Sequence, residues 1–506
     1  MPTGSPSFEQ DARKIAISLE RHRYLFLILL TIVYALGAVR HAANRPLWYD
    51  EIITVISASA PDAAGTWKTA QVTDASPPLL HLLTHFSMQW FGSSEVAIRL
   101  PAIAGFWVFC LCLFRFVRRR AGIFFAFVAL LMPVATEAYT YSYEARAYGA
   151  ELGFCGLMLI GWQIAGEGRR RMAGCALIAV SMACALLCQY YAVLLYLPLG
   201  GAELYRTWRE RRWNWGIWVA FVCGIAPLVW RITTVRFIVD NFSRTTWAPA
   251  NLGQIFEFWE LMLAHSLSFV VAGLVVLALA LIAQRGGEEA SNPPKLAPHE
   301  MMVAILFLAI PVAAVGIGIF KTHMFTPRYA LIGVTGVCLL VPMIAARLSN
   351  GRALPGFLLM AVSILPLLFV MLAVPDRENP LEREATLVRA IEQGQVIVPD
   401  GQLYLQMWYY LPPALKSKLL FLSDYDAAVR YMGFDSIDRG VDALKTSCSA
   451  RIMDYKDFAG PGREFRIYQS SMRPGWILAK AVGEGASTQI EQYSINRQLI
   501  RIRLKD

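Results

Sequence analysis

Charged residues are scarce in this chain of 506 residues, and their scarcity limits what the protein can be. Only 17% of the residues are Asp, Glu, Lys or Arg, whereas 56% are hydrophobic and the mean hydropathy is +0.44. Soluble globular domains carry about a quarter charged residues, so this composition excludes an ordinary soluble protein. The sequence therefore predicts an α-helical polytopic membrane protein.

Signals for several other protein classes are also missing. Of the nine cysteines, only Cys448 lies in a polar segment, and the others fall in or beside apolar runs, where cysteine packs as a small hydrophobe. Their spacing predicts neither a disulfide framework nor a paired-cysteine metal site. No glycine-rich phosphate loop occurs, so we expect no nucleotide or organic cofactor. The net charge of +10 does not indicate nucleic acid as a partner, because the arginines gather at the ends of apolar runs, beside lipid headgroups.

Apolar runs between arginine clusters predict about eleven membrane spans. The N-terminal stretch has no small-residue cleavage site before the first run, so we expect that run to be retained as an anchor. Basic clusters precede the first span and follow the second, fourth and sixth, and the positive-inside rule places these loops and the N-terminus in the cytoplasm. The predicted spans are residues 24–40, 96–117, 121–137, 147–166, 172–188, 191–206, 214–231, 266–283, 301–320, 328–346 and 354–374.

The polar tail, residues 375–506, differs from the transmembrane domain of residues 1–374. An odd number of spans places this tail outside the cytoplasm. Short β-rich runs alternate there with helical patterns, which predicts a small soluble α/β domain. The expected strands are residues 396–398, 418–422, 451–453, 465–468 and 476–480, and the expected helices are residues 381–393 and 424–432.

The first outer loop, residues 41–95, holds two adjacent carboxylates, Asp50 and Glu51. A Trp-Tyr pair precedes them and suits the depth of lipid headgroups. Two interpretations fit acids in this position: ordinary solvation at the membrane interface, or part of a site at the water boundary.

Residues 77–91 of the same loop form an apolar stretch that is too short to span a membrane, which predicts an interfacial helix. His81 and His85 would share one face of this helix, as two metal ligands would. The polar stripe of an amphipathic helix also explains the pair. We favour that interpretation, because no Glu occupies the spacing found in metalloproteases.

Two more outer segments gather polar and aromatic side chains. Residues 137–149 hold four tyrosines and two glutamates, and residues 321–329 hold several donors that could meet a lipid phosphate at the outer leaflet. Such residues also anchor the ends of spans, so both interpretations of the second segment stay open. Its donors are Lys321, His323, Arg328 and Tyr329.

Six motifs occur in the order seen in bacterial GT-C glycosyltransferases. The ordered set covers about residues 24–346 and resembles the protein mannosyltransferase-like group that includes lipid A aminoarabinose transferases. The motifs are Trp-Tyr-Asp-Glu (48–51), Ser-Pro-Pro-Leu-Leu-His-Leu-Leu (76–83), Phe-Gly-Ser-Ser-Glu-Val-Ala-Ile-Arg-Leu-Pro (91–101), Tyr-Ser-Tyr-Glu-Ala-Arg-Ala-Tyr (141–148), Gln-Tyr-Tyr (189–191) and Pro-Arg-Tyr (327–329).

The resemblance implies a GT-C enzyme of the bacterial inner membrane with a periplasmic C-terminal domain. Such an enzyme takes a sugar from a polyprenyl-phosphate carrier and transfers it to lipid A, a core glycan, a polysaccharide or a protein. By position, Asp50 corresponds to the catalytic base and Glu51 to its support, while Arg328 and Tyr329, with Lys321 and His323 beside them, correspond to the carrier-phosphate site. The substrate-binding positions implied are Glu144, Arg146, Tyr148, His81, Tyr190 and Tyr191.

One departure concerns a metal ion. Ser76 precedes the Pro-Pro motif, where relatives often carry His, Lys or a metal-binding acid, so a divalent ion held by Asp50 and Glu144 stays an open expectation.

Proteins with other functions also have this many membrane spans. A flippase or transporter would place charges at mid-membrane, a polysaccharide polymerase or ligase would use a carrier diphosphate, and an assembly protein would use only the tail. The gathering of charged and aromatic residues at one face favours the transferase.

Overall fold

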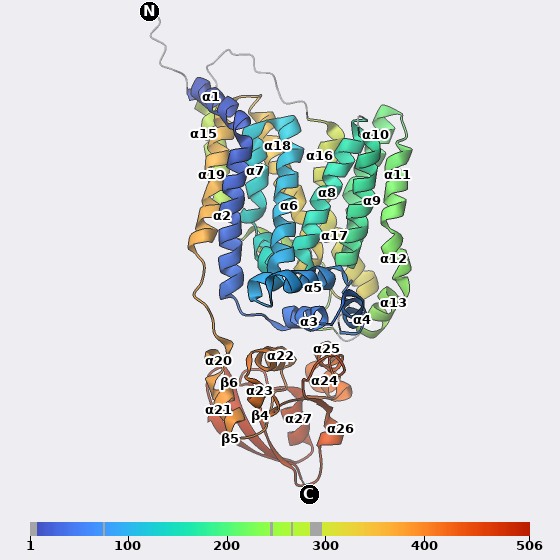
Figure 1. The fold of residues 1–506 in the computed structure, drawn as a ribbon, viewed down its shortest axis with the longest axis vertical. Helices are drawn as coiled ribbons and strands as arrows, with labels where there is room; N and C mark the ends of the chain where they lie inside the picture. The colour runs from blue at the N-terminus through green and yellow to red at the C-terminus, as the bar shows by residue number, and fades with distance from the viewer. Residues whose placement is uncertain are drawn as a thin grey trace, which may run out of the picture. The chain divides into compact units, whose positions relative to one another are not determined.

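The computed structural model describes residues 8–73, 76–168, 170–242, 246–264, 267–283 and 296–505. The chain forms two compact units, coloured by residue number in Figure 1. The second unit joins most of the predicted first outer loop to the polar tail. We call the first the bundle unit (Met1–Ala42, Arg99–Thr233, Ala250–Pro375) and the second the sheet unit (Ala43–Ile98, Thr234–Pro249, Asp376–Asp506).

Long apolar helices build the bundle unit (Figure 1). Among the described residues, five helices are long and apolar enough to cross a membrane, or up to seven if each of two bent pairs counts as one span. The predicted multi-span membrane protein is therefore confirmed, while the count of about eleven spans stays a prediction. The five are α2 (Arg23–Asn44), α6 (Glu95–Ala121), α9 (Arg171–Cys188), η5 with α18 (Pro327–Leu348) and α19 (Ala353–Leu372).

Glycines let α6 and α8 (Ala147–Gly166) approach closely. A Cβ on Gly105 of α6 would lie 2.6 Å from the backbone of Ala150, and one on Gly153 of α8 would lie 2.6 Å from the carbonyl oxygen of Gly105. Small residues at such crossings are typical of packed membrane helices. This contact fixes α8, which carries Tyr148 in its first turn and follows directly after Arg146.

The other elements of the bundle unit are shorter, and the stretch Ile123–Ala135 meets Glu137–Tyr143 at a bend of 73°. They are α1 (Phe8–Arg21), α7 (Ile123–Leu131), η1 (Met132–Ala135), η2 (Glu137–Tyr143), η3 (Tyr190–Leu195), α10 (Tyr196–Glu210), α11 (Trp215–Gly224), α12 (Ala226–Trp230), α14 (Gln254–Leu263), α15 (Leu267–Ala283), α16 (Pro298–Phe307), α17 (Ile310–Ile317) and η4 (Gly318–Thr322). The span Pro327–Leu348 consists of η5 (Pro327–Gly333) and α18 (Val334–Leu348). Helix α13 (Ile232–Phe242) has residues in both units. One span was predicted to begin at residue 266, which lies outside the described residues.

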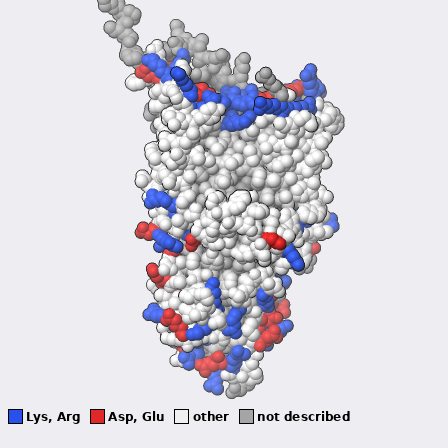
Figure 2. All heavy atoms as spheres, viewed as in Figure 1, with Lys and Arg blue, Asp and Glu red and all other residues white. Residues whose placement is uncertain are grey.

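Basic side chains gather at one end of the bundle unit (Figure 2). The last turn of α6 supplies Arg118, Arg119 and Arg120 to this end. The arginine clusters thus share one end, as the positive-inside rule requires of cytoplasmic loops. That this end is cytoplasmic stays a prediction.

A mixed six-stranded sheet forms the tail part of the sheet unit, in the order β3-β2-β1-β4-β6-β5 among the described residues. Strands β1 to β4 pair in parallel, whereas β6 pairs antiparallel with β4 and β5. Ile397 pairs with Leu420 and Ile467, and Ile467 pairs with Ile500, so one buried apolar row crosses four strands. The strands are β1 (Val396–Ile397), β2 (Leu419–Ser423), β3 (Ile452–Asp454), β4 (Glu464–Ser470), β5 (Ser487–Tyr493) and β6 (Arg497–Arg503).

The predicted α/β character of the tail is confirmed, but the strand predicted at residues 476–480 is wrong. Those residues open the helix α27 (Trp476–Gly483), in which Trp476, Ile477 and Ala481 are buried. The Trp-Ile-Leu run favours a strand locally, but its buried side chains follow a helical face. The other tail helices are α20 (Pro380–Arg383), α21 (Ala385–Gln393), α22 (Gly401–Tyr410), α23 (Pro413–Lys416), α24 (Tyr425–Met432), α25 (Ser436–Asp442) and α26 (Tyr455–Phe458).

Three short helices form the loop part of the sheet unit. They are α3 (Tyr49–Ala58), α4 (Ala63–Thr73) and α5 (Leu79–Phe91), and each packs against the other two. The helix predicted over residues 77–91 is confirmed and begins two residues later, after the Pro-Pro pair. Its placement at a membrane interface stays a prediction.

Candidate functional site

Asp50 and Glu51 lie in the first turn of α3. Trp48 has an extended backbone, with φ −108° and ψ 176°, so the helix begins at Tyr49. The Glu51 side chain is fully buried, and its carboxylate accepts a hydrogen bond from the Trp48 N–H at 3.3 Å. Glu51 therefore closes the start of the helix, as the acid of a capping box does, while its half-buried neighbour Asp50 belongs to the same fixed turn.

Helix α5 supports α3 through histidine. His85 Nδ1 lies 2.8 Å from the carbonyl oxygen of Ala58, and the Gln89 amide nitrogen lies 3.0 Å from His85 Nε2. Both ring nitrogens of His85 thus have protein partners, which favours a structural role over metal ligation. His81 is also buried.

The described residues contain no group of three or more His, Cys, Asp or Glu side chains placed to hold a metal ion. The expected pair Asp50 and Glu144 stays a prediction.

In the bundle unit, the structure brings three of the predicted segments together. The rings of Tyr191 and Tyr329 stack at 4.8 Å with an interplanar angle of 15°. The Tyr191 hydroxyl lies 3.2 Å from the Thr322 hydroxyl, next to Lys321. The Gln-Tyr-Tyr motif, the end of η4 and the Pro-Arg-Tyr motif therefore form one cluster, which we call the tyrosine cluster.

The segments that form the tyrosine cluster also carry basic side chains. Lys321 and His323 are exposed, and Arg328 is half-buried at the start of η5. The backbone of His323 takes the left-handed conformation, with φ +50°, and its carbonyl oxygen accepts a hydrogen bond from the Ala250 N–H at 3.2 Å. This turn ends η4 and leads the chain back into η5.

Arg231 was not among the predicted site residues. Its guanidinium Nε lies 3.5 Å from the hydroxyl of Tyr190, and the residue is 6% exposed. An arginine that directly follows a short apolar helix, α12, was the available signal. Arg231 therefore adds a buried cation beside the tyrosine cluster.

The remaining predicted residues lie at the start of α8 and just before it. Glu144 and Tyr148 are buried, and the extended backbone of Arg146 starts the helix. The ring of Tyr148 packs edge-on against Tyr141 at 5.2 Å. Helix α8 also packs against η5, which carries Arg328.

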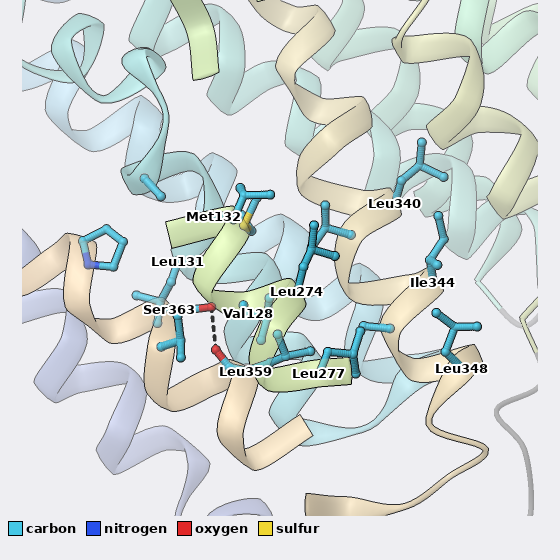
Figure 3. A pocket seen from close by; sticks show the side chains of 17 residues that line it. Val128, Leu131, Met132, Leu274, Leu277, Leu340, Ile344, Leu348, Leu359 and Ser363 are labelled. Carbon is cyan, nitrogen blue, oxygen red and sulfur yellow. Dashed lines mark hydrogen bonds between the residues drawn. The ribbon is translucent and has the colours of Figure 1, made fainter. Parts of the chain in front are cut away.

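Two cavities open in the bundle unit. The first, of about 410 Å³, is lined by polar and aromatic side chains that include His41, Glu137 and Tyr143. The second, of about 230 Å³, is almost wholly apolar (Figure 3). Its Ser363 hydroxyl donates a hydrogen bond to the Leu359 carbonyl oxygen at 2.8 Å, so that polar group is satisfied within α19.

The two cavities share Ala135 and Pro366 in their walls. They thus form an amphipathic pair, with a polar part beside η2 and an apolar part between α7, α15, α18 and α19. Ligand pockets are typically apolar with a few placed polar groups, and this pair combines both kinds of lining.

Comparison with known proteins identifies the fold. No protein-family model and no curated protein matches the sequence. The structure of ArnT from Cupriavidus metallidurans in the apo state matches with a TM-score of 0.58 and 14% identity, over 95% of this chain and 98% of that one. The structure of the same protein bound to undecaprenyl phosphate matches with a TM-score of 0.55 and 14% identity, over 94% and 97% of the two chains.

The chain therefore has the fold of ArnT over nearly its whole length. This confirms, for the fold, the resemblance drawn from the six motifs. The roles of single residues stay predictions. Asp50, Glu51 and His81 belong to the sheet unit, whereas the predicted phosphate residues and the other predicted substrate residues belong to the bundle unit.

Proposed function

We propose that the protein is a GT-C glycosyltransferase of a bacterial inner membrane. In this proposal it transfers a sugar from a polyprenyl-phosphate carrier to an acceptor on the periplasmic face. The observation that carries the proposal is the likeness in fold to ArnT over about 95% of the chain, since one ArnT structure holds undecaprenyl phosphate, a carrier of the predicted class.

The tyrosine cluster supports a site for the carrier phosphate. A leaving phosphate needs donors that neutralise its charge, and a guanidinium binds two phosphate oxygens at once. We assign this role to Arg328, with Lys321 as a second charge and Tyr329 held in place by its stacking on Tyr191. His323 and Tyr190 complete the predicted surroundings.

The α3 turn supports a base at Asp50. In the proposed reaction the acceptor oxygen forms a bond to the anomeric carbon while the bond from that carbon to the phosphate oxygen breaks. The acceptor proton moves to Asp50, and the electron pair leaves with the phosphate. Glu51 supports the base by closing the first turn of α3, and we assign Glu144, Arg146, Tyr148 and His81 to substrate binding.

The amphipathic cavities favour a lipid among the acceptors. Glu137 lines the polar cavity, and no Lys or Arg occurs among the described residues of its wall, so this cavity is poorly suited to a phosphate. A hydroxyl-rich headgroup with its chain in the apolar cavity fits better. The carrier phosphate would bind at Arg328 instead.

Sugar transfer by purified protein in nanodiscs tests the proposal, with undecaprenyl-phosphate sugars as donors, envelope lipids as acceptors and product detection by mass spectrometry. Asp50→Asn should lower turnover by ~100-fold or more, because an amide cannot accept the proton. The control Asp62→Asn changes an exposed acid of the same loop that accepts a hydrogen bond from the Gly65 N–H, and it should turn over normally.

The donor arm of the experiment measures binding of the undecaprenyl-phosphate sugar. Arg328→Ala should weaken it by roughly 10- to 100-fold, since a hydrogen bond to a charged group contributes about 1.5–3 kcal/mol.

Normal turnover by Asp50→Asn would remove Asp50 from the mechanism. Transport of the lipid-linked sugar without any transfer would identify a flippase, and use of only a diphosphate-linked donor would identify a polymerase or ligase.

A further inference from the structure

The tail part of the sheet unit holds the backbone just before the predicted base. The Leu47 N–H donates a hydrogen bond to the Tyr410 hydroxyl at 2.7 Å. The Gln406 side-chain amide donates one to the Leu47 carbonyl oxygen at 2.8 Å. Gln406 and Tyr410 lie four residues apart on α22 and therefore share one face. Both backbone polar groups of the fully buried Leu47 are thus bound by one helix of the tail.

A second tail helix holds the residue adjacent to Asp50. The Tyr49 hydroxyl donates a hydrogen bond to the carbonyl oxygen of Ile437 in α25 at 3.4 Å. A Cβ added to Gly440 of the same helix would collide with this hydroxyl. Glycine at position 440 therefore makes the space that the Tyr49 side chain fills.

The groups that make these contacts are themselves fixed. The Arg383 guanidinium donates a hydrogen bond to the Gln406 amide oxygen at 2.6 Å, which turns the amide nitrogen toward Leu47. Helix α22 starts on an Asp400 cap, and its Gly401 packs closely against Ile437 of α25. The two helices form one preorganised surface, which we call the loop clamp, made of Gln406 and Tyr410 on α22 and Ile437 and Gly440 on α25.

We propose that the loop clamp positions the catalytic base: the tail fixes the backbone from Leu47 to Tyr49 and thereby the direction of Asp50. The inference rests on the proposed function, which makes Asp50 the base. Gln406, Tyr410 and Tyr49 are positioning residues. The first turn of a helix otherwise frays, and a base must be held to within about 0.5 Å of its working position.

Two single variants test the proposal in the full-length protein. Gln406→Ala and Tyr410→Phe each remove one hydrogen bond to Leu47 and should lower kcat by ~10- to 100-fold, because a misplacement of about 1 Å has an effect of this size. The KM for the undecaprenyl-phosphate sugar should stay unchanged. The matched controls are Gln402→Ala, an exposed glutamine on the same helix, and Tyr409→Phe, the neighbouring tyrosine, and both should leave kcat unchanged.

Hydrogen exchange provides a readout that does not depend on turnover. Residues 45–51 should exchange faster in Gln406→Ala and Tyr410→Phe than in the wild-type protein or the controls, while the strands of the sheet exchange at the wild-type rate. Gly440→Ala should also speed exchange in residues 45–51 and lower kcat, because its Cβ would collide with the Tyr49 hydroxyl. Adding Tyr49→Phe removes the colliding hydroxyl and should restore part of the kcat that Gly440→Ala loses.

The outcomes separate this proposal from the proposed function. Normal turnover by Asp50→Asn would overturn the assignment of the base. An inactive Asp50→Asn together with normal kcat in Gln406→Ala and Tyr410→Phe would overturn only the loop clamp. A rise in KM with unchanged kcat would also overturn it, because that result places the clamp in donor binding.

Discussion

Two buried carboxylates, one in each unit, have different partners. In the bundle unit, Glu300 is 1% exposed and is paired with the Arg120 guanidinium, at 2.7 and 3.1 Å, and with the Gln163 amide at 3.0 Å. In the sheet unit, Asp438 is 6% exposed, and its carboxylate accepts a hydrogen bond from a neutral group, the Trp476 indole N–H, at 3.0 Å.

The difference follows from the surroundings. The Arg120 guanidinium bound to Glu300 compensates the desolvation of a buried carboxylate with an opposite charge. Asp438 accepts its hydrogen bond from a neutral indole, which brings no compensating charge, so burial favours the protonated acid. Burial raises the pKa of Asp438 to about 7, and the charges of Asp435 and Asp424 add to this shift. Glu300 therefore has a cation as its partner, whereas Asp438 titrates near neutral pH.

The largest expected effect comes from breaking the bundle pair. Arg120→Ala leaves Glu300 buried without its cation and should lower the free energy of unfolding by ~3–5 kcal/mol. Thermal unfolding in detergent micelles measures the loss. Adding Glu300→Gln should restore much of it, because the amide carries no charge.

The control for this pair is a surface pair on α1. Lys14 and Asp11 lie 3.1 Å apart and are largely exposed, so Lys14→Ala should change stability by less than about 1 kcal/mol. Equal losses from Arg120→Ala and Lys14→Ala would show that the bundle pair is no more important than a surface pair.

The next effect is the pH dependence of the sheet unit. The pKa of Asp438 rises from an ordinary value of 3.8 to about 7 on folding, so between these values the folded state binds more protons than the unfolded state. Its contribution to stability is complete below pH 3.8 and is lost as the pH rises to about 7, at up to ~1.4 kcal/mol per pH unit. Asp438→Asn should remove this slope.

Hydrogen exchange in the strands, measured from pH 5 to 8 and corrected for the intrinsic rate, gives the stability of the sheet at each pH. The comparison is between the wild-type protein and Asp438→Asn, since other carboxylates titrate equally in both. Identical pH profiles would show that Asp438 does not carry the effect.

The sequence predicted the fold class well where composition decides it. Apolar runs located the membrane helices, and the polar tail with its β-rich runs was confirmed as a mixed sheet. Prediction failed at residues 476–480, because local preference favoured a strand while tertiary burial of Trp476 required a helix. It also missed β5 and β6. In β5 most side chains are exposed, so the strand has no apolar pattern to detect.

The candidate site shows a similar limit. The motifs selected Tyr191 and Tyr329, which the fold stacks together, but no pattern linked Leu47 to Gln406 or Tyr410 more than 350 residues later. Those bonds join side chains to backbone groups, and any residue at position 47 other than proline offers the same donor and acceptor. The sequence therefore has no signature for them.

The smallest expected effect concerns a half-buried pair next to Asp438. The Lys480 ammonium lies 2.6 Å from the carboxylate of Asp424, which caps α24. Lys480→Met keeps most of the apolar stem and removes the charge, so it should cost about 1 kcal/mol or less, and the loss should shrink at high salt. It should also raise the pKa of Asp438 further, because the charge of Asp424 then faces Asp438 without compensation. An unchanged titration midpoint in Lys480→Met would mean that burial alone sets this pKa, and the contrast between Glu300 and Asp438 would then rest on desolvation.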